Sequence, residues 1–138
     1  MYLLDTNVVS VLRRPDTAPA PVVSWAAGIE VAEMYLSAMT LYELELGVQR
    51  IERRDQVQGE MLRTWLTRSV RTQFRDRILP IDDTVAARCA SLQVPDPRPE
   101  RDSFIGATAL VHRLVLVTRN VKDFASMGVE LLNPWDQH

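Results

Sequence analysis

The sequence predicts an α/β domain with a mostly parallel sheet. Short apolar runs of strand length alternate with longer segments whose apolar residues recur every three or four positions, which is the order of repeated strand–helix units. The chain has 138 residues, 46% of them hydrophobic, and no Gly/Ser-rich linker or shift in composition divides it. We therefore expect one domain over residues 1–138 with an ordinary buried core.

The first third of the chain is expected to hold two strands, each connected to a helix. Residues 2–4 are a short apolar run, and residues 6–12 follow as a short helix that the sequence RRP at 13–15 ends. After a proline-rich joint, the apolar residues of 22–29 fall at helical spacing, and residues 34–37 (MYLS) predict a second strand.

The middle of the chain carries the clearest helical periodicity. Residues 39–54 and residues 56–74 each have apolar side chains at steps of three and four, which predicts two long amphipathic helices. A strand follows at 77–81 (RILPI), interrupted by Pro80. The apolar face of the first of these helices consists of Leu41, Leu44, Val48 and Ile51. The apolar residues of the second are Val57, Met61, Leu62, Trp65, Leu66, Val70 and Phe74.

The last third of the chain repeats the alternation. Residues 83–93 predict a helix, and the three prolines within 95–99 end it. The next helix begins near Asp102 and leads into a strand at 115–118 (VLVT). A short helix and a last apolar run, VELL at 129–132, complete the chain.

Composition and charge exclude several classes of protein. The net charge of −2 argues against binding nucleic acid through bulk basicity. The single cysteine, Cys89, excludes an internal disulfide framework and a CxxC metal site, and its helical setting favours an inert core thiol. The N-terminus lacks the pattern of a secretory signal and no apolar run is long enough for a membrane span, so we expect a cytoplasmic protein without membrane association.

Arginine is concentrated in the middle of the chain. Residues 50–77 carry eight basic side chains against four acidic ones, and all eight are arginine. A solvated helix face is the favoured interpretation of such a run. A surface that contacts phosphate is the alternative, because the guanidinium group binds phosphate oxygens in a bidentate manner.

Five polar residues lie near the carboxyl ends of the predicted strands. Asp5 directly follows the first strand, Glu43 lies in the first turn of the helix after the second, and Asn120 and Asp123 follow the fourth. Asp102 opens a helix that runs antiparallel to the fourth strand and so begins at that strand's carboxyl end. Because the carboxyl ends of parallel strands share one edge of the sheet, we expect these side chains to gather there.

Each of these residues also has a purely structural interpretation. Asp5 can cap a helix, and Thr40 with Glu43 fits a T-x-x-E capping box. Asp102 can compensate a helix dipole, and Asn120 with Asp123 has the spacing of another capping pair. Taken together the acids favour a bound cation, because two carboxylates about 4 Å apart repel by about 4 kcal/mol at an effective dielectric constant near 20.

The donor set indicates which cation the acids would bind. Oxygen ligands without cysteine suit Mg²⁺ or Mn²⁺. Neither His112 nor His138 has metal-ligand spacing. Gly47, one turn beyond Glu43, either leaves room for a ligand there or permits close helix packing.

Four motifs in this order resemble those of a known family. LLDTNV at the start, LYELELGV around Glu43, RDSFIGATAL around Asp102 and TRNVKDF near the end are similar to those of PIN-domain ribonucleases of the VapC toxin type, and the ending NPW resembles the FitB-like members. The resemblance implies a three-layer α/β/α fold with a central parallel sheet of four to five strands. It also implies Mg²⁺- or Mn²⁺-dependent endoribonuclease activity, a toxin role in a type II toxin–antitoxin system, a cognate antitoxin and a homodimer.

The resemblance also assigns roles to individual residues. Catalytic roles fall on Asp5, Glu43, Asp102 and Asp123, and metal ligation falls on Asp5, Glu43, Asp102 and Asn120. Thr6, Thr118 and Arg119 are supporting residues that would orient ligands, water or the RNA backbone. The fourth site residue is left open between Asn120 and Asp123, since family members differ at this point.

Two other functions are compatible with the sequence. A receiver-like signalling module would also gather acids around Mg²⁺ and transfer a phosphoryl group to one aspartate, with Thr118 and Lys122 as helpers, but it would not depend on Glu43. A PIN module with a decayed site that binds RNA or protein without catalysis is the second alternative, and Asn120 gives it some support.

Overall fold

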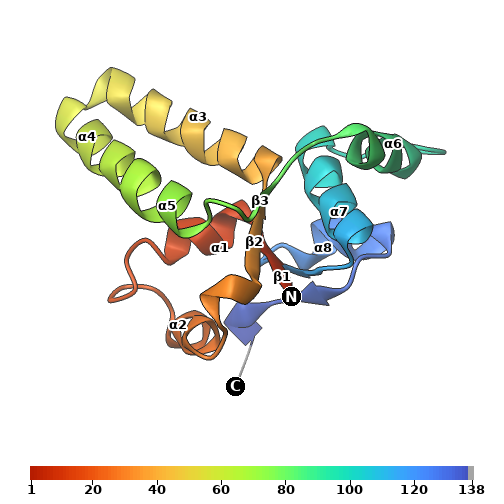
Figure 1. Ribbon diagram of the computed structural model, residues 1–138, viewed down its shortest axis with the longest axis horizontal. Helices are drawn as coiled ribbons and strands as arrows, with labels where there is room; N and C mark the ends of the chain where they lie inside the picture. The colour runs from red at the N-terminus through yellow and green to blue at the C-terminus, as the bar shows by residue number, and fades with distance from the viewer. Residues whose placement is uncertain (137–138) are drawn as a thin grey trace.

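A five-stranded parallel sheet is the centre of the computed structural model, which describes residues 1–136 (Figure 1). The strand order is β3-β2-β1-β4-β5, and every pairing between neighbouring strands is parallel. The expected α/β fold and the five-stranded sheet are confirmed. The strands are β1 (Tyr2–Leu4), β2 (Met34–Ser37), β3 (Ile78–Leu79), β4 (Val115–Val117) and β5 (Leu131–Leu132).

The first strand occupies the middle of the sheet. Leu3 lies opposite Tyr35 of β2 on one side and opposite Leu116 of β4 on the other. Because β1 is paired along both edges and covered on both faces, a run of apolar residues is what its position requires. The residue that follows β1 therefore emerges at the centre of the sheet's carboxyl edge.

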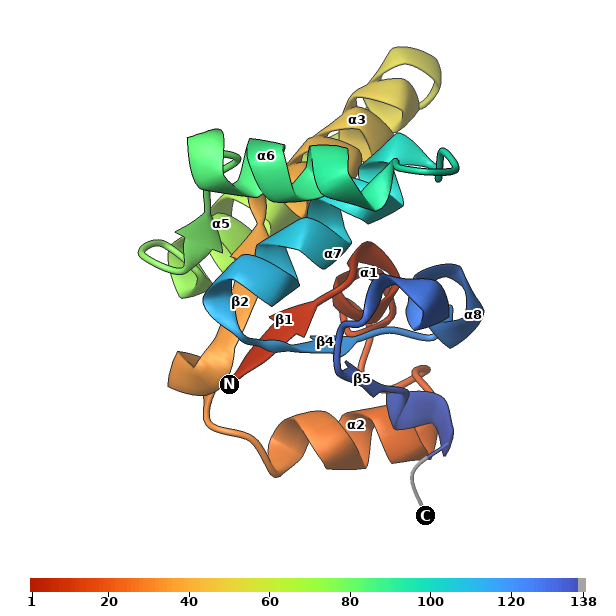
Figure 2. The ribbon, with the colours of Figure 1, turned by 90° about the vertical axis from the view of Figure 1, so that its right-hand side faces the viewer.

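Helices cover both faces of the sheet (Figures 1 and 2). A hydrophobic core lies on each face of the sheet, and alternate residues of β1 point to opposite faces. Leu3 packs with residues of α6 and α7, whereas Leu4 packs with residues of α1 and α3. The helices are α1 (Thr6–Val11), α2 (Ala20–Ala27), α3 (Ala38–Arg54), α4 (Gln56–Thr64), α5 (Arg71–Gln73), α6 (Asp83–Leu92), α7 (Glu100–His112) and α8 (Val121–Phe124). Short 3₁₀ segments lie at Val31–Glu33, Ala125–Met127 and Pro134–Asp136.

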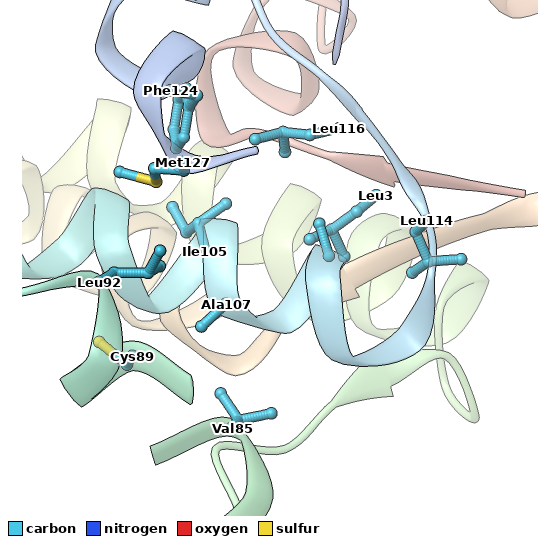
Figure 3. Close-up of a cluster of buried hydrophobic side chains, with 11 residues drawn as sticks. Leu3, Val85, Cys89, Leu92, Ile105, Ala107, Leu114, Leu116, Phe124 and Met127 are labelled. Atoms are coloured by element: carbon cyan, nitrogen blue, oxygen red, sulfur yellow. The ribbon is translucent and has the colours of Figure 1, made fainter. Parts of the chain in front are cut away.

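The core between the sheet and the pair α6–α7 includes the only cysteine of the chain (Figure 3). Cys89 is 4% exposed and packs in the same cluster as Val85 and Ile105. Burial raises the pKa of the thiol, which further disfavours the reactive thiolate. The environment is that of an inert core residue, as the sequence indicated.

The segment predicted as one helix over 56–74 is divided in the structure. The α-helix α4 passes into a π-helical turn, Trp65–Val70, before α5. Part of the apolar face predicted for it is wrong, because Val57 is 69% exposed and Met61 is 53% exposed. The side of α4 that meets α3 instead carries Gly59, where a Cβ atom would come within 2.6 Å of the Glu52 Cα atom.

Helix starts differ from the sequence prediction by one or two residues. α3 begins at Ala38 because the Ser37 hydroxyl caps it, accepting a 3.0 Å hydrogen bond from the Thr40 amide. Glu43 consequently lies in the second turn of α3, not the first. α7 begins at Glu100 and includes Asp102 in its first turn. Over residues 1–136, no helix combines the length and the apolar character needed to cross a bilayer.

Candidate active site

Asp5 lies at the centre of the carboxyl edge of the sheet and is 5% exposed. Its Oδ2 atom accepts a 2.7 Å hydrogen bond from the Thr118 hydroxyl and a 3.3 Å hydrogen bond from the Asn7 amide group. Its Oδ1 atom accepts a 2.8 Å hydrogen bond from the Thr6 backbone N–H and so caps α1. The capping interpretation of Asp5 is therefore correct, and the same bonds fix its carboxylate at the edge where the other acids lie.

Glu43 is connected to the same edge by a hydroxyl group. The Thr6 hydroxyl donates a 2.6 Å hydrogen bond to Glu43 Oε1, and it lies 3.4 Å from the Thr40 hydroxyl. The predicted Thr40–Glu43 capping box is wrong, since the cap of α3 is Ser37. Glu43 is thus directed toward the β1–α1 turn instead of its own helix end.

Asp102 is partly buried, and nearby negative charges act on it. Burial is the largest cause that raises its pKa to about 6, and the charges of Asp5, Asp123 and Glu43 add to it in that order. Burial also raises the pKa of Asp5, against the hydrogen bonds from Thr118 and Thr6, and the charges of Glu43 and Asp123 contribute to this rise. Four carboxylates from four separate segments therefore lie close enough that the others disfavour the ionisation of Asp5 and Asp102.

The fourth segment contains both Asn120 and Asp123, and they differ in their contacts. The Asn120 backbone N–H donates a 3.0 Å hydrogen bond to the Thr118 hydroxyl, and the Asp123 backbone N–H donates to the Asn120 carbonyl at 3.0 Å. The Asn120 side chain makes no capping hydrogen bond to α8, so a capping pair of side chains is not formed. Of the two, only the Asp123 side chain carries a charge that acts on Asp5 and Asp102.

The set of donors fits a hard divalent cation, although the carboxylates are not yet converged on one point. Within residues 1–136, no three His, Cys, Asp or Glu side chains stand at metal-ligand spacing. Glu43 is engaged by Thr6 on one oxygen and lies 3.8 Å from the Arg101 guanidinium on the other. A cation would relieve the repulsion that adds to burial in raising the pKa of Asp102.

The two histidines lie away from these acids or beyond the described residues. His112 is in the last turn of α7, whereas Asp102 is in its first, and His138 lies outside the described residues. Arg119 lies at the cluster's margin: its backbone N–H donates a 3.3 Å hydrogen bond to Asn7 Oδ1, and its guanidinium carbon is 5.5 Å from the centre of the Trp135 ring.

A hollow of about 400 Å³ begins beside Thr6 and Glu43 and follows α3 toward Trp65. Gly47 lines this hollow, and a Cβ atom added there would meet nothing within 4 Å. Of the two interpretations of Gly47, close helix packing is therefore wrong, and open space for a ligand beside Glu43 is confirmed.

Three contacts at the site were not predicted from the sequence. Asn7 bonds to Asp5, Thr40 lies beside Thr6, and Arg101 faces Glu43. Each is next to, or within three residues of, a predicted acid, so the signal was proximity in the sequence. What the sequence did not give is the direction of each side chain.

Comparison with known proteins assigns the fold. The model of the PIN domain matches residues 2–130. The chain belongs to the PIN-domain family. The family resemblance of the four sequence motifs and the three-layer arrangement are thereby confirmed.

Several relatives of this PIN domain have names that state a role. The chain is 36% identical to Toxin FitB of Neisseria gonorrhoeae over 140 residues, which cover 98% of this chain and 99% of that protein. It is 29% identical to VapC ribonuclease Y4jK of Sinorhizobium fredii over 150 residues, 99% of each chain. It superposes with a TM-score of 0.90 and 35% identity on a chain of the crystal structure of FitAcB from Neisseria gonorrhoeae, covering 99% of both chains.

Proposed function

We propose that this PIN domain is a Mg²⁺- or Mn²⁺-dependent endoribonuclease and the toxin of a type II toxin–antitoxin pair. The observation that supports the activity best is that the charges of Glu43 and Asp123 act on both Asp5 and Asp102 at one edge of the sheet. Relatives named as a ribonuclease and as a toxin support the substrate class and the biological role.

The proposed roles follow from the contacts of each residue. Asp5, Glu43 and Asp102 would hold the ion with Asp123 or Asn120 as the fourth group, and a bound ion would lower the pKa of a water molecule that attacks the RNA phosphodiester. The Thr118 hydroxyl keeps Asp5 in one orientation, and the Thr6 hydroxyl does the same for Glu43. Arg119 is exposed beside the cluster and would bind the RNA backbone.

The partners proposed for this chain come from its relatives. Structures similar to it include FitAB bound to a DNA fragment, at 33% identity and a TM-score of 0.89. We extend to this chain a cognate antitoxin that covers the acidic edge, since a cationic side chain entering it would offset the repulsion among the acids. A homodimer and a cytoplasmic location, where RNA is available, belong to the same proposal.

The test is cleavage of a single-stranded RNA with Mg²⁺ or Mn²⁺ by purified protein. Asp5→Asn and Asp102→Asn should each abolish the metal-dependent cleavage, because each removes a charge that the ion needs. Asp16→Asn is the matched control, since Asp16 is an exposed aspartate in the loop after α1. Cleavage that persists in both site variants would contradict the proposal.

The same assay separates the alternative functions. A receiver-like module is not supported, because the chain belongs to the PIN family and Glu43 acts on the same cluster as Asp5. A decayed RNA-binding module would bind the RNA but would not cleave it with either Mg²⁺ or Mn²⁺. Wild-type protein that binds RNA without cleaving it would favour this alternative.

A further inference from the structure

Tyr42 and Arg101 form a cation–aromatic pair beside the acidic cluster. The guanidinium carbon of Arg101 lies 5.2 Å from the centre of the Tyr42 ring. The same guanidinium group is 3.8 Å from Glu43 Oε2, so the pair is one residue away from the proposed site on both α3 and α7. Neither residue has a role in the activity proposed above.

Both side chains are accessible to a ligand. Tyr42 is 50% exposed, and the Arg101 side chain is 48% exposed. A large aromatic residue with half of its surface in water gains little for the stability of the fold, because its apolar area is not buried. The exposure is better suited to binding than to core packing.

The ion pair between Arg101 and Glu43 is weak. At 3.8 Å the contact is longer than a charge-assisted hydrogen bond, which needs about 2.7–2.9 Å. Since half of the Arg101 side chain is in water, solvent also screens this ion pair. The guanidinium group is therefore available to a stronger anionic partner such as a phosphate, which it can bind through two parallel hydrogen bonds.

The surface next to Tyr42 is hollowed. A depression of about 370 Å³ is lined by Tyr42, Leu46 and Gln49 of α3 and reaches Arg71 at the start of α5. That volume is within the range of about 300–1,000 Å³ found for small-molecule sites. Glu45 also lines the hollow, and its charge is paired with Arg63. Arg101 is outside this lining but lies over the Tyr42 ring, so an aromatic ring, apolar side chains and a guanidinium group stand beside one another, as the base, sugar and phosphate of a nucleotide require.

We infer that Tyr42 and Arg101 form a subsite for one unpaired nucleotide of the RNA, next to the phosphate that is cut. The base of this nucleotide stacks on the Tyr42 ring, and its phosphate group binds the Arg101 guanidinium. Single-stranded RNA is recognised through aromatic stacking and arginine contacts of this type. The inference rests on the proposed ribonuclease function, and it adds a substrate contact on the α3–α7 side of the acids.

The topology gives this subsite a defined place on the substrate. β2 precedes α3 and lies on one side of β1, whereas β4 and β5 lie on the other. α3, which carries Tyr42, and the turn that carries Arg119 thus follow strands on opposite sides of β1, and Asp5 follows β1 itself. An RNA strand crossing the carboxyl edge would pass Arg119 on one side of the scissile phosphate and Tyr42 with Arg101 on the other.

Binding can be measured without cleavage. Fluorescence anisotropy of a labelled single-stranded RNA with the purified protein in EDTA reports affinity alone. Tyr42→Ala should weaken binding about fivefold or more, as expected for the loss of one stacked base, while Tyr42→Phe should bind as the wild type does. Arg101→Ala should weaken binding and should reduce the slope of log affinity against log salt concentration by about 0.7, the value for one phosphate contact on a single strand.

Arg14→Ala is the matched control for charge, because Arg14 is exposed in the loop after α1 and not beside the acids. An equal loss of affinity in Arg14→Ala and Arg101→Ala would show non-specific attraction and would overturn the subsite. A Tyr42→Ala protein that becomes monomeric from a wild-type dimer, by light scattering, would show that this face binds a second copy and would overturn it too.

Cleavage assays separate the subsite from the function on which it rests. With Mn²⁺, Tyr42→Ala and Arg101→Ala should raise KM for single-stranded RNA, whereas Arg14→Ala should leave KM as in the wild type. If the wild-type protein cleaves RNA and both variants match it on every substrate, the subsite alone is wrong. If the wild-type protein neither binds nor cleaves RNA, the proposed function is wrong and the subsite falls with it.

Discussion

Replacing Asp102 by asparagine should remove much of the pH dependence that the metal-free acidic cluster gives to folding stability. Burial, followed by the charges of Asp5, Asp123 and Glu43, raises the pKa of Asp102 from 3.8 to about 6. Between these values the folded protein retains a proton that the unfolded chain releases. The stabilising contribution of this group is therefore fully present below pH 3.8 and is lost as the pH rises through about 6.

The size of the effect follows from the shift in pKa. Each pKa unit corresponds to about 1.4 kcal/mol, so the rise at Asp102 corresponds to about 3 kcal/mol of unfolding free energy. Because this carboxyl group is only partly buried, solvent screening reduces the expected value to about 1–2 kcal/mol. Asparagine has nearly the same shape and carries no charge. Asp102→Asn should accordingly be about 1–2 kcal/mol more stable than the wild type at about pH 7.5, and equally stable at about pH 4.

Urea unfolding in EDTA at a series of pH values measures this difference directly, with EDTA removing any cation that would offset the repulsion. Asp16→Asn changes an exposed aspartate and should follow the wild-type curve. An Asp102→Asn protein whose stability differs from wild type by the same amount at both pH values would refute the electrostatic reasoning. So would a variant that is the less stable of the two at the higher pH.

Three other perturbations test the structure. Thr118→Val removes the hydroxyl donor of a buried carboxylate and should lower the free energy of unfolding by about 1–3 kcal/mol, whereas Thr118→Ser keeps the donor and should lower it less. Urea unfolding measures both variants, and an equal loss of stability in the two would contradict a role for the hydrogen bond. Gly59→Ala places a methyl group 2.6 Å from the Glu52 Cα atom and should destabilise by about 1–3 kcal/mol, while Gly47→Ala should be neutral or stabilising by up to about 1 kcal/mol; the same midpoint shift in both would contradict the packing described. Cys89 should react with a thiol reagent only upon unfolding, and rapid labelling of the native protein would contradict its burial.

The sequence was sufficient for the fold because its local signals agree with one another. Apolar runs of strand length, amphipathic helices and the prolines at 95–99 all indicate the same alternation of strands and helices, and that alternation leads to a parallel sheet. The prediction failed where tertiary packing decides. Val57 and Met61 have helical spacing, yet the face of α4 that packs on α3 is the one bearing Gly59. Close backbone approach selects a small residue, which hydrophobic periodicity cannot detect.

The candidate site was predictable in outline for the same reason. Once the strands are parallel, Asp5 and Asp123 must meet at the carboxyl edge, whatever their distance along the chain. The detailed contacts were not predictable, because they depend on side-chain direction. Thr40 and Glu43 have the spacing of a capping box, but Ser37 had already capped the helix, and this leaves Glu43 for Thr6. Arg101 and Tyr42 come from different helices, so their contact needs the packed structure.

The position of β1 in the sheet has a consequence for how the protein is made. The hydrogen bond between Thr118 and Asp5 joins residues 113 positions apart, and β4 supplies one of the two neighbours of β1. A nascent chain that has left the ribosome only as far as α7 has Asp5 and Glu43 but lacks Thr118, Asn120 and Asp123, and one edge of its first strand is unpaired. The acidic cluster is thus completed only after residues 118–123 have been synthesised, so a nascent chain that ends before them has no assembled site.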